Sequence, residues 1–310
     1  MTVPTSWSPT HDDPLLILAM DHRGSFGSSL FGVEHDSPTD EQAGRMRHAK
    51  QLIYAGLRDV RAQVTIGRPG VLVDEQYGAA VVAAAPSDDV VLAIPVEASG
   101  HDWFTLEYGE QWLDHVREVA PAYAKVLVRD NPWFDASDRS RQLDDLAKVS
   151  AGLADAGVPF LYELLVPATD EQKASVSGDT DRYDRDVRPG LVTQVIADNQ
   201  RAGVAPRLWK VEGLETVDAA RAVAGQARSG GHDADLIVLG RDAPQERLDH
   251  WLDVAAQVDA FVGFAIGRSI WEEAIRDWTH GTIDDTEAAT RIGRTYLSYA
   301  QRWSRDVTSS

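Results

Sequence analysis

A lysine in the middle of an apolar run is the residue of this chain with the clearest chemical potential. The run LWKVEG occupies residues 208–213 and is predicted to be a buried strand, on which side chains alternate between two faces. Lys210 and Glu212 therefore share one face, while Trp209 and Val211 share the other, which suits packing against helices. An enclosed lysine has a lowered pKa and becomes an amine nucleophile, the usual source of a Schiff base.

Lysine usage supports a special role for this residue. The chain has only 5 lysines against 25 arginines, and they are Lys50, Lys125, Lys148, Lys173 and Lys210. Lys125 and Lys210 lie in strand-like runs, whereas the other three lie in polar helical or loop contexts. The alternative is a lysine at a strand end that keeps its ammonium group in water.

Charged residues also lie in or directly after other predicted strands. The strand phases place five of them on inward faces, namely Asp21, Glu97, Lys125, Glu163 and Lys210. We expect these five to converge, and Lys125 to lower the pKa of Lys210 by repulsion between like charges. The alternative is a polar plug of structural ion pairs, which are weak stabilisers.

Two glycine-arginine pairs end the last two predicted strands, in LGR (239–241) and IGRS (266–269). Backbone N–H groups of glycine and a helix N-terminus commonly bind phosphate at such positions. Gly240, Arg241, Gly267, Arg268 and Ser269 are therefore candidates for binding a substrate phosphate. The alternative is that these glycines only form turns and that the arginines only face solvent. Four further strand-end residues are candidates for other substrate contacts: His22, Arg23, Glu97 and Arg129.

These candidates would be positioned by eight strands, each followed by a helical segment. The predicted strands are 15–20, 70–78, 90–100, 124–132, 159–167, 208–213, 234–241 and 260–269. Eight such units without a linker predict a single-domain α/β protein, a closed (β/α)₈ TIM barrel with its active site at the C-terminal strand ends. A doubly wound open sheet is the runner-up, but the dinucleotide fingerprint is missing from DHRGSFGSS.

The segments between the strands carry three further expectations. Residues 1–13 are read as a loose N-terminal segment and 280–310 as a C-terminal helix and tail. Residues 24–38 are read as a loop that precedes a helix over 39–64. The Asp-rich stretch 168–184 is read as a solvated loop and a candidate lid, since its aspartates lack the spacing of a calcium loop.

Composition narrows the classes of function. A net charge of −19 argues against nucleic acid or an anionic membrane as the main partner, although a homo-oligomer remains compatible with it. There is no cysteine, so disulfides and thiolate metal sites are excluded. The histidines lack metal-ligand spacing, and nothing in the sequence demands a cation beside Asp21, Asp74 and Glu75, so we expect neither metal nor cofactor. Neither a signal peptide nor a membrane span is recognisable, which predicts a cytoplasmic setting.

Seven motifs in one order carry a family resemblance. DHRGSF, LVDEQYG, AKVLVRDNP, FLYELLVP, WKVEG, IVLGR and GFAIGRS resemble motifs of the class I aldolases related to tagatose-1,6-bisphosphate aldolase. The closer likeness is to the aldolase-like domain found with 5-dehydro-2-deoxygluconokinase of inositol catabolism. The resemblance covers roughly residues 15–299 and implies a (β/α)₈ barrel with Lys210 as the Schiff-base lysine.

The same resemblance implies roles for the surrounding residues. Asp21, Glu97, Lys125 and Glu163 would form the polar cluster around the lysine, and Arg268 with its neighbouring glycines would hold phosphate. The tagatose-type enzymes are similar except that Gln follows the first-strand Asp, where this chain has His22. That departure suggests a substrate other than tagatose bisphosphate. The inositol-pathway likeness implies 5-dehydro-2-deoxy-D-gluconate 6-phosphate as the substrate. The resemblance to the wider family implies a sulfonated ketose phosphate as another candidate substrate.

The resulting hypothesis is a metal-independent aldolase. Lys210 attacks a ketone, Glu163 shuttles protons and Asp21 deprotonates the hydroxyl whose carbon becomes an aldehyde. Two other classes remain open on the sequence. One is a non-catalytic sugar-phosphate-binding protein that regulates a partner kinase. The other is an isomerase or decarboxylase that uses lysine and aspartate without a covalent step.

Overall fold

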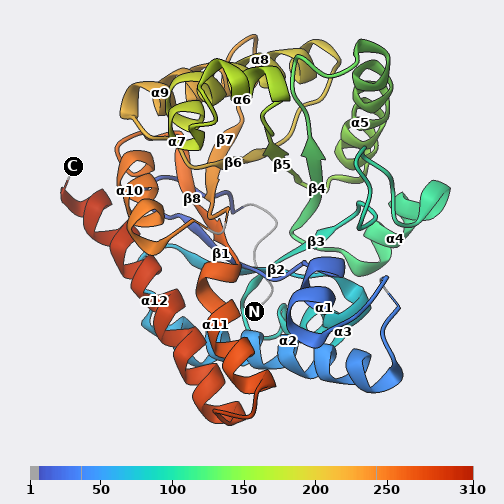
Figure 1. Ribbon diagram of the computed structural model, residues 1–310, viewed down its shortest axis with the longest axis vertical. Coiled ribbons are helices and arrows are strands. Elements are labelled where there is room, and N and C mark those ends of the chain that lie inside the picture. The colour runs from blue at the N-terminus through green and yellow to red at the C-terminus, as the bar shows by residue number, and fades with distance from the viewer. Residues whose placement is uncertain (1–6, 36, 242, 310) are drawn as a thin grey trace. The chain divides into compact units, whose positions relative to one another are not determined.

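The computed structural model describes residues 7–35, 37–241 and 243–309 (Figure 1). Its strands are β1 (Leu15–Ala19), β2 (Arg68–Leu72), β3 (Val91–Pro95), β4 (Tyr123–Arg129), β5 (Phe160–Leu165), β6 (Leu208–Glu212), β7 (Asp235–Leu239) and β8 (Phe261–Ile266). Its α-helices are α1 (Gly24–Phe31), α2 (Asp40–Val60), α3 (Glu75–Ala84), α4 (Trp112–Val119), α5 (Ala136–Ala156), α6 (Asp170–Ser175), α7 (Thr180–Arg182), α8 (Arg188–Arg201), α9 (Val217–Ala227), α10 (Gln245–Ala255), α11 (Arg268–Thr279) and α12 (Asp285–Ser309). Two 3₁₀ turns, η1 (Arg61–Gln63) and η2 (Gly109–Gln111), and a π-helical turn, η3 (Tyr183–Val187), complete the elements.

The strands form a closed parallel barrel in the order β1 to β8, with helices between consecutive strands. The predicted (β/α)₈ fold is thereby confirmed. A doubly wound open sheet, which would leave two edge strands, is excluded by the closure. The strands are short and buried along most of their length, as expected when both faces of a parallel sheet are covered.

The chain divides into two compact units, each with four strands that neighbour one another. The first unit contains the described residues of Met1–Pro95, Gly240–Asp249 and Gly263–Ser310, and pairs β8, β1, β2 and β3 in that order. The second contains Val96–Leu239 and His250–Val262, and pairs β4, β5, β6 and β7. Register in the second unit sets Glu163 of β5 beside Lys210 of β6.

Helices of the first unit are fixed by capping and by buried aromatic side chains. A capping box between Thr39 and Gln42 starts α2, which packs along α12 in Figure 1. The hydroxyl of Tyr296 on α12 donates a 2.8 Å hydrogen bond to the carbonyl of Leu16 in β1. The C-terminal helix α12 is therefore tied directly to a barrel strand.

Three expectations for the connecting segments are corrected by the structure. Part of the predicted loop before α2 is the helix α1, because Phe26 and Phe31 are buried while the serines between them face out. The second strand ends at Leu72, since Asp74 caps the helix α3 by accepting from the amide of Tyr77 at 2.8 Å. The stretch 168–184 is not a plain loop, because it holds α6, α7 and the start of η3.

The N-terminal segment is only partly within the described residues, since 1–6 lie outside them. From residue 7 onward the segment is held in place: the indole of Trp7 donates to Asp13 at 2.6 Å, and its ring lies 4.7 Å from the guanidinium of Arg68. At the other end, the predicted C-terminal helix is α12. No helix in the described part of the chain has the length and apolar character needed to cross a bilayer.

Lys50 on α2 is fully buried, contrary to its polar helical context in the sequence. Its ammonium donates to the carbonyls of Met20 at 2.7 Å and His22 at 3.0 Å, and pairs with the buried carboxylate of Asp74. Three acceptors match the three N–H donors of a lysine. Lys50 therefore fixes the residues that follow β1 against those that follow β2.

Replacing Lys50 by methionine is expected to destabilise the protein by about 3–5 kcal/mol, because the carboxylate of Asp74 would be left buried without its cation. Urea unfolding monitored by circular dichroism measures this difference. The matched control is Lys148→Met, since Lys148 is 75% exposed and is expected to change the free energy of unfolding by less than about 0.5 kcal/mol.

The stability supplied by Lys50 is expected to depend on pH. Burial lowers its pKa from the ordinary 10.5 to about 7, with Asp21 opposing this shift and Arg23 adding to it. Between these two pH values the unfolded chain binds more protons than the folded one, so the free energy of unfolding rises with pH. The stability difference between wild type and Lys50→Met should therefore grow from pH 7 to pH 9, and a constant difference would contradict the assignment.

Candidate active site

Three charged residues of the second unit share one face of three neighbouring strands. Lys125 on β4 and Glu163 on β5 have the phase that the sequence predicts, and Glu163 lies opposite Lys210 on β6. The alternate positions pack away from them, as the rings of Tyr162 and Trp209 show, with centroids 4.5 Å apart. Strand alternation and register together place the lysines and the carboxylate side by side.

Their side chains form a continuous chain of ion pairs that also includes Glu97. Lys210 Nζ lies 2.7 Å from Glu163 Oε1, and Lys125 Nζ lies 3.0 Å from Glu163 Oε2. Lys125 Nζ also donates to Glu97 Oε1 at 2.6 Å. All four side chains are at most 10% exposed. Two positive and two negative charges balance, which is the condition under which charges are tolerated in a barrel interior.

Exposure increases along β4 from this cluster toward the end of the strand. Lys125 is buried, Leu127 is half-buried and Arg129 is exposed, and all three share one face of the strand. Leu165, which pairs with Arg129 on β5, is also half-buried. The inner face of β4 therefore becomes exposed at its end, four residues beyond Lys125.

Glu97 is oriented by a hairpin that the sequence analysis did not predict. The amide of Ala98 donates to the carbonyl of Thr105 at 2.8 Å, and Glu97 bridges antiparallel to Leu106. Pairing starts where β3 ends, so Glu97 sits at the base of the hairpin. The tip carries Gly100 at a φ of 82°, a conformation natural to glycine. The run ASGHDW is the signal that could have indicated a turn there.

A second buried group lies at the end of β6, and sequence reasoning missed most of it. Glu212 accepts the amide of Val166 at 2.9 Å, and the hydroxyl of Tyr183 donates to the carbonyl of the same residue at 3.1 Å. Arg188 is buried and pairs with Asp184 at 2.9 Å. Asp184 belongs to the stretch predicted to be solvated, so that prediction is wrong at this residue: Asp184 is 2% exposed.

Two nearby aspartates, one in that stretch and one just after it, serve local structure. Asp179 caps α7 by accepting from the amide of Arg182, and Asp186 pairs with Arg185 at 3.0 Å. Side-chain hydrogen bonds from Arg185 lower the pKa of Asp186. Within the described residues, no cluster of three or more histidine, aspartate or glutamate side chains has the arrangement of a metal site.

The first unit carries the other predicted residues, beginning with those after β1. Asp21 and His22 are half-buried, and Arg23 is buried. The His22 ring meets Trp271 edge-on, with centroids 5.6 Å apart. A Cβ on Gly267 would lie 2.6 Å from the carbonyl of Ala19 and 3.1 Å from the His22 ring, so only glycine allows this approach. The structure thus brings His22 and Gly267 together.

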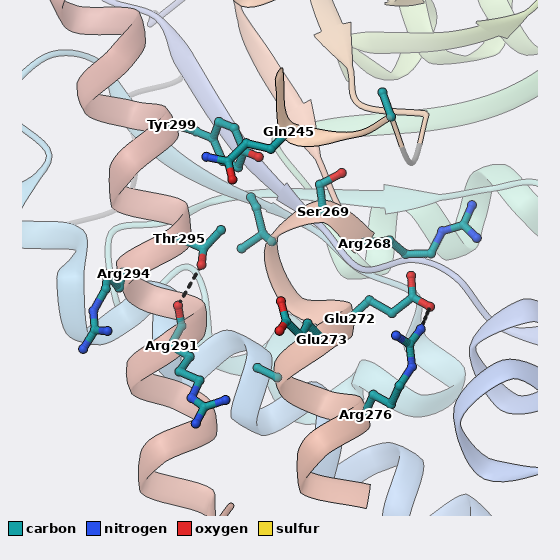
Figure 2. Close-up of a pocket in the computed structure, with 13 residues that line it drawn as sticks. Gln245, Arg268, Ser269, Glu272, Glu273, Arg276, Arg291, Arg294, Thr295 and Tyr299 are labelled. Atoms are coloured by element: carbon teal, nitrogen blue, oxygen red, sulfur yellow. Dashed lines mark hydrogen bonds and ion pairs between the residues drawn. The ribbon is translucent and has the colours of Figure 1, made fainter. Parts of the chain in front are cut away.

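The glycine-arginine pairs after β7 and β8 are partly brought together. A Cβ on Gly240 would lie 3.6 Å from Ser269 Oγ, so these two predicted phosphate contacts are neighbours. Ser269 and Arg268 line one end of a pocket of about 480 Å³ between α11 and α12, whereas Arg241 is exposed. Figure 2 shows the guanidinium groups of Arg268 and Arg294 pointing away from each other. These two arginines therefore do not converge on one point.

The fold is a closed (β/α)₈ barrel, and its second unit carries a buried cluster of lysines and carboxylates. The chain belongs to the family described as uncharacterized protein conserved in bacteria (DUF2090), whose model matches residues 5–307. None of the curated proteins matches it in sequence.

Two solved structures are similar to this chain in fold. One is Cgl0159 from Corynebacterium glutamicum (Brevibacterium flavum), 17% identical with a TM-score of 0.58. The other is a fructose-bisphosphate aldolase from Slackia heliotrinireducens, 12% identical with a TM-score of 0.54. Each match covers 92% of this chain and 86% of the other.

Proposed function

We propose that this protein is a class I aldolase that cleaves a phosphorylated ketose or keto acid through a Schiff base on Lys210. The observation that carries the proposal is the carboxylate of Glu163, which bridges two buried lysines on the adjacent strands at 2.7 and 3.0 Å. One lysine can then act as the nucleophile while the other holds the carboxyl group beside it. Binding alone would not require this arrangement.

The first half of the reaction forms the imine. The neutral amine of Lys210 attacks the substrate ketone, and the resulting carbinolamine loses its hydroxyl as water. Glu163 is the proton donor for that loss, because its Oε1 already lies within hydrogen-bond distance of Lys210 Nζ. Lys125 keeps its other oxygen in place, and Glu97 holds Lys125. The product is a protonated imine covalently attached to Lys210.

The second half breaks the carbon–carbon bond. Asp21 takes the proton from the hydroxyl on the carbon that becomes the aldehyde, and the bonding electron pair moves into the iminium to give an enamine. Asp21 releases this proton to solvent, Glu163 regains one from solvent, and Glu163 then protonates the enamine carbon. Hydrolysis of the new imine releases the second product and restores the free amine. Each proton removed is returned in the cycle, so the reaction needs neither oxidant nor reductant.

The substrate we favour is 5-dehydro-2-deoxy-D-gluconate 6-phosphate, cleaved to dihydroxyacetone phosphate and malonate semialdehyde. The motif resemblance supports this choice, as does His22, which replaces the glutamine of the tagatose-type enzymes. Gly240, Gly267, Arg268 and Ser269 are proposed to bind the phosphate, with Arg241 beside them. His22, Arg23, Glu97 and Arg129 are proposed to contact the rest of the substrate. Tagatose bisphosphate and sulfofructose phosphate are the alternatives.

A borohydride-trapping screen over ketose phosphates, read by intact mass, tests the proposal. The favoured substrate should give a reduced adduct that peptide mapping assigns to Lys210, and turnover should persist in EDTA. Turnover without any adduct would instead indicate an isomerase or decarboxylase. Strong loss of activity in EDTA would indicate a metal-dependent mechanism, and tight binding without product would indicate a regulator.

A further inference from the structure

Arg188 is a buried cation that the proposed reaction has not yet used. It is the first residue of α8 and has no exposed surface. Its Nε lies 2.9 Å from Asp184 Oδ1, and its Nη2 donates to the carbonyl of Gly213 at 2.8 Å. A Cβ on Gly213 would lie 2.0 Å from the Trp251 ring, so the backbone that holds Arg188 is itself fixed by close packing. The guanidinium is therefore held rigidly at the end of β6.

The third nitrogen of this guanidinium, Nη1, has N–H groups that no acceptor in the described part of the chain binds. Nη1 lies 3.8 Å from Glu212 Oε2, beyond hydrogen-bond distance, and it meets no hydrogen-bond partner among the described residues. Glu212 Oε2 already accepts the amide of Val166 at 2.9 Å. Buried donors without a partner are rare in folded proteins, and such a donor calls for a ligand or an ordered water.

Strand geometry sets these donors close to the proposed nucleophile. Glu212 follows Lys210 by two residues on β6, so both side chains leave the same face of the strand. Same-face neighbours on a strand are about 7 Å apart along its axis. Nη1, which lies beside Glu212, is therefore about two residues farther along β6 than Lys210, at a level toward the C-terminal end of the strand. The carbon chain of a ketone bound to Lys210 would pass this level if it ran toward the end of the strand.

We infer that Arg188 Nη1 binds an oxygen of the substrate within about three carbons of the imine carbon, so that the site selects ketones with a hydroxyl or carboxylate there. This inference rests on the proposed function and defines its substrate class more closely. The planar, rigid guanidinium explains why this residue is an arginine. Two of its nitrogens bind groups of the protein, and the third remains available for the ligand. A lysine at this position would keep the positive charge but could not donate hydrogen bonds in all three directions.

The test compares two ketones with the same four-carbon skeleton, erythrulose and butanone, in borohydride trapping on the full-length protein. Wild type should reach half-maximal labelling of Lys210 at a lower concentration of erythrulose than of butanone. Arg188→Lys should reduce that preference by about tenfold or more, because a hydrogen bond to a charged group is lost. Labelling by butanone should change by less than about twofold, since it has no oxygen for Arg188 to bind.

Arg139→Lys is the matched control. Arg139 is also largely buried, and it pairs with Asp130 at 2.7 Å and Asp198 at 2.8 Å, away from the β6 face. This variant should leave the preference for erythrulose unchanged even if the protein becomes less stable. If Arg188→Lys does not fold, as judged by circular dichroism, the double variant Arg188→Gln/Asp184→Asn removes one charge of each sign and serves instead.

The outcomes separate the two proposals. An equal fall in labelling by both ketones, or an unchanged preference in Arg188→Lys, would overturn the inference and assign Nη1 to an ordered water. Absence of any adduct on Lys210 with either ketone in wild type would overturn the proposed function itself. A selective loss for erythrulose supports both.

Discussion

Lys210→Met is expected to abolish turnover and the borohydride adduct together. The loss should be on the order of 10⁶-fold in kcat, the scale on which removal of a covalent nucleophile acts in other enzymes. Methionine keeps most of the volume but offers no amine, so no imine can form. Stopped assays of aldehyde release, together with intact mass after borohydride reduction, measure both effects on the same sample.

A purely structural lysine would give a different pattern. Lys210→Met leaves Glu163 paired with Lys125 alone, so the variant is also expected to be less stable. The double variant Lys210→Met/Glu163→Gln restores charge balance and should recover part of the lost stability without recovering any turnover. Recovery of turnover in the double variant would show that Lys210 only neutralises Glu163.

Glu163→Gln is expected to lower kcat by about 10²–10⁴-fold, the usual contribution of a general acid-base group. Glutamine is nearly isosteric and still reaches Lys210, but it cannot donate and recover a proton. The adduct on Lys210 should still form, although more slowly, because the amine itself is retained. Rapid-quench trapping against time measures the rate of imine formation separately from turnover.

Glu97→Gln is the comparison for that variant, and because Glu97 is a proposed substrate contact its own effect should fall mainly on KM. It removes the other carboxylate that contacts Lys125, at 2.6 Å, and leaves the pair between Glu163 and Lys210 intact. Its loss of kcat should be much smaller than that of Glu163→Gln. Equal losses in the two variants would mean that the cluster acts only through its total charge, which contradicts a specific role for Glu163.

Much of the fold could be read from the sequence because its signals are local. Apolar runs separated by helical periodicity predict eight βα units, and alternation along a strand places Lys125, Glu163 and Lys210 on one face without any coordinates. The predicted end of a strand was wrong where a residue that caps the next helix was read as part of the strand. Asp74 is the example, since an acidic residue after an apolar run fits either reading until its bond to the amide of Tyr77 is known.

Local patterns in the chain are enough to place lysines and carboxylates at the strand ends, and therefore to predict a lysine-carboxylate cluster. Which other charges are buried depends on how distant elements pack. Lys50 and Arg188 lie in polar segments of the sequence, yet both are fully buried, because carbonyl groups from segments distant in the chain accept hydrogen bonds from them. Burial of a charge depends on whether acceptors from other elements surround it, and no local pattern records where those elements pack.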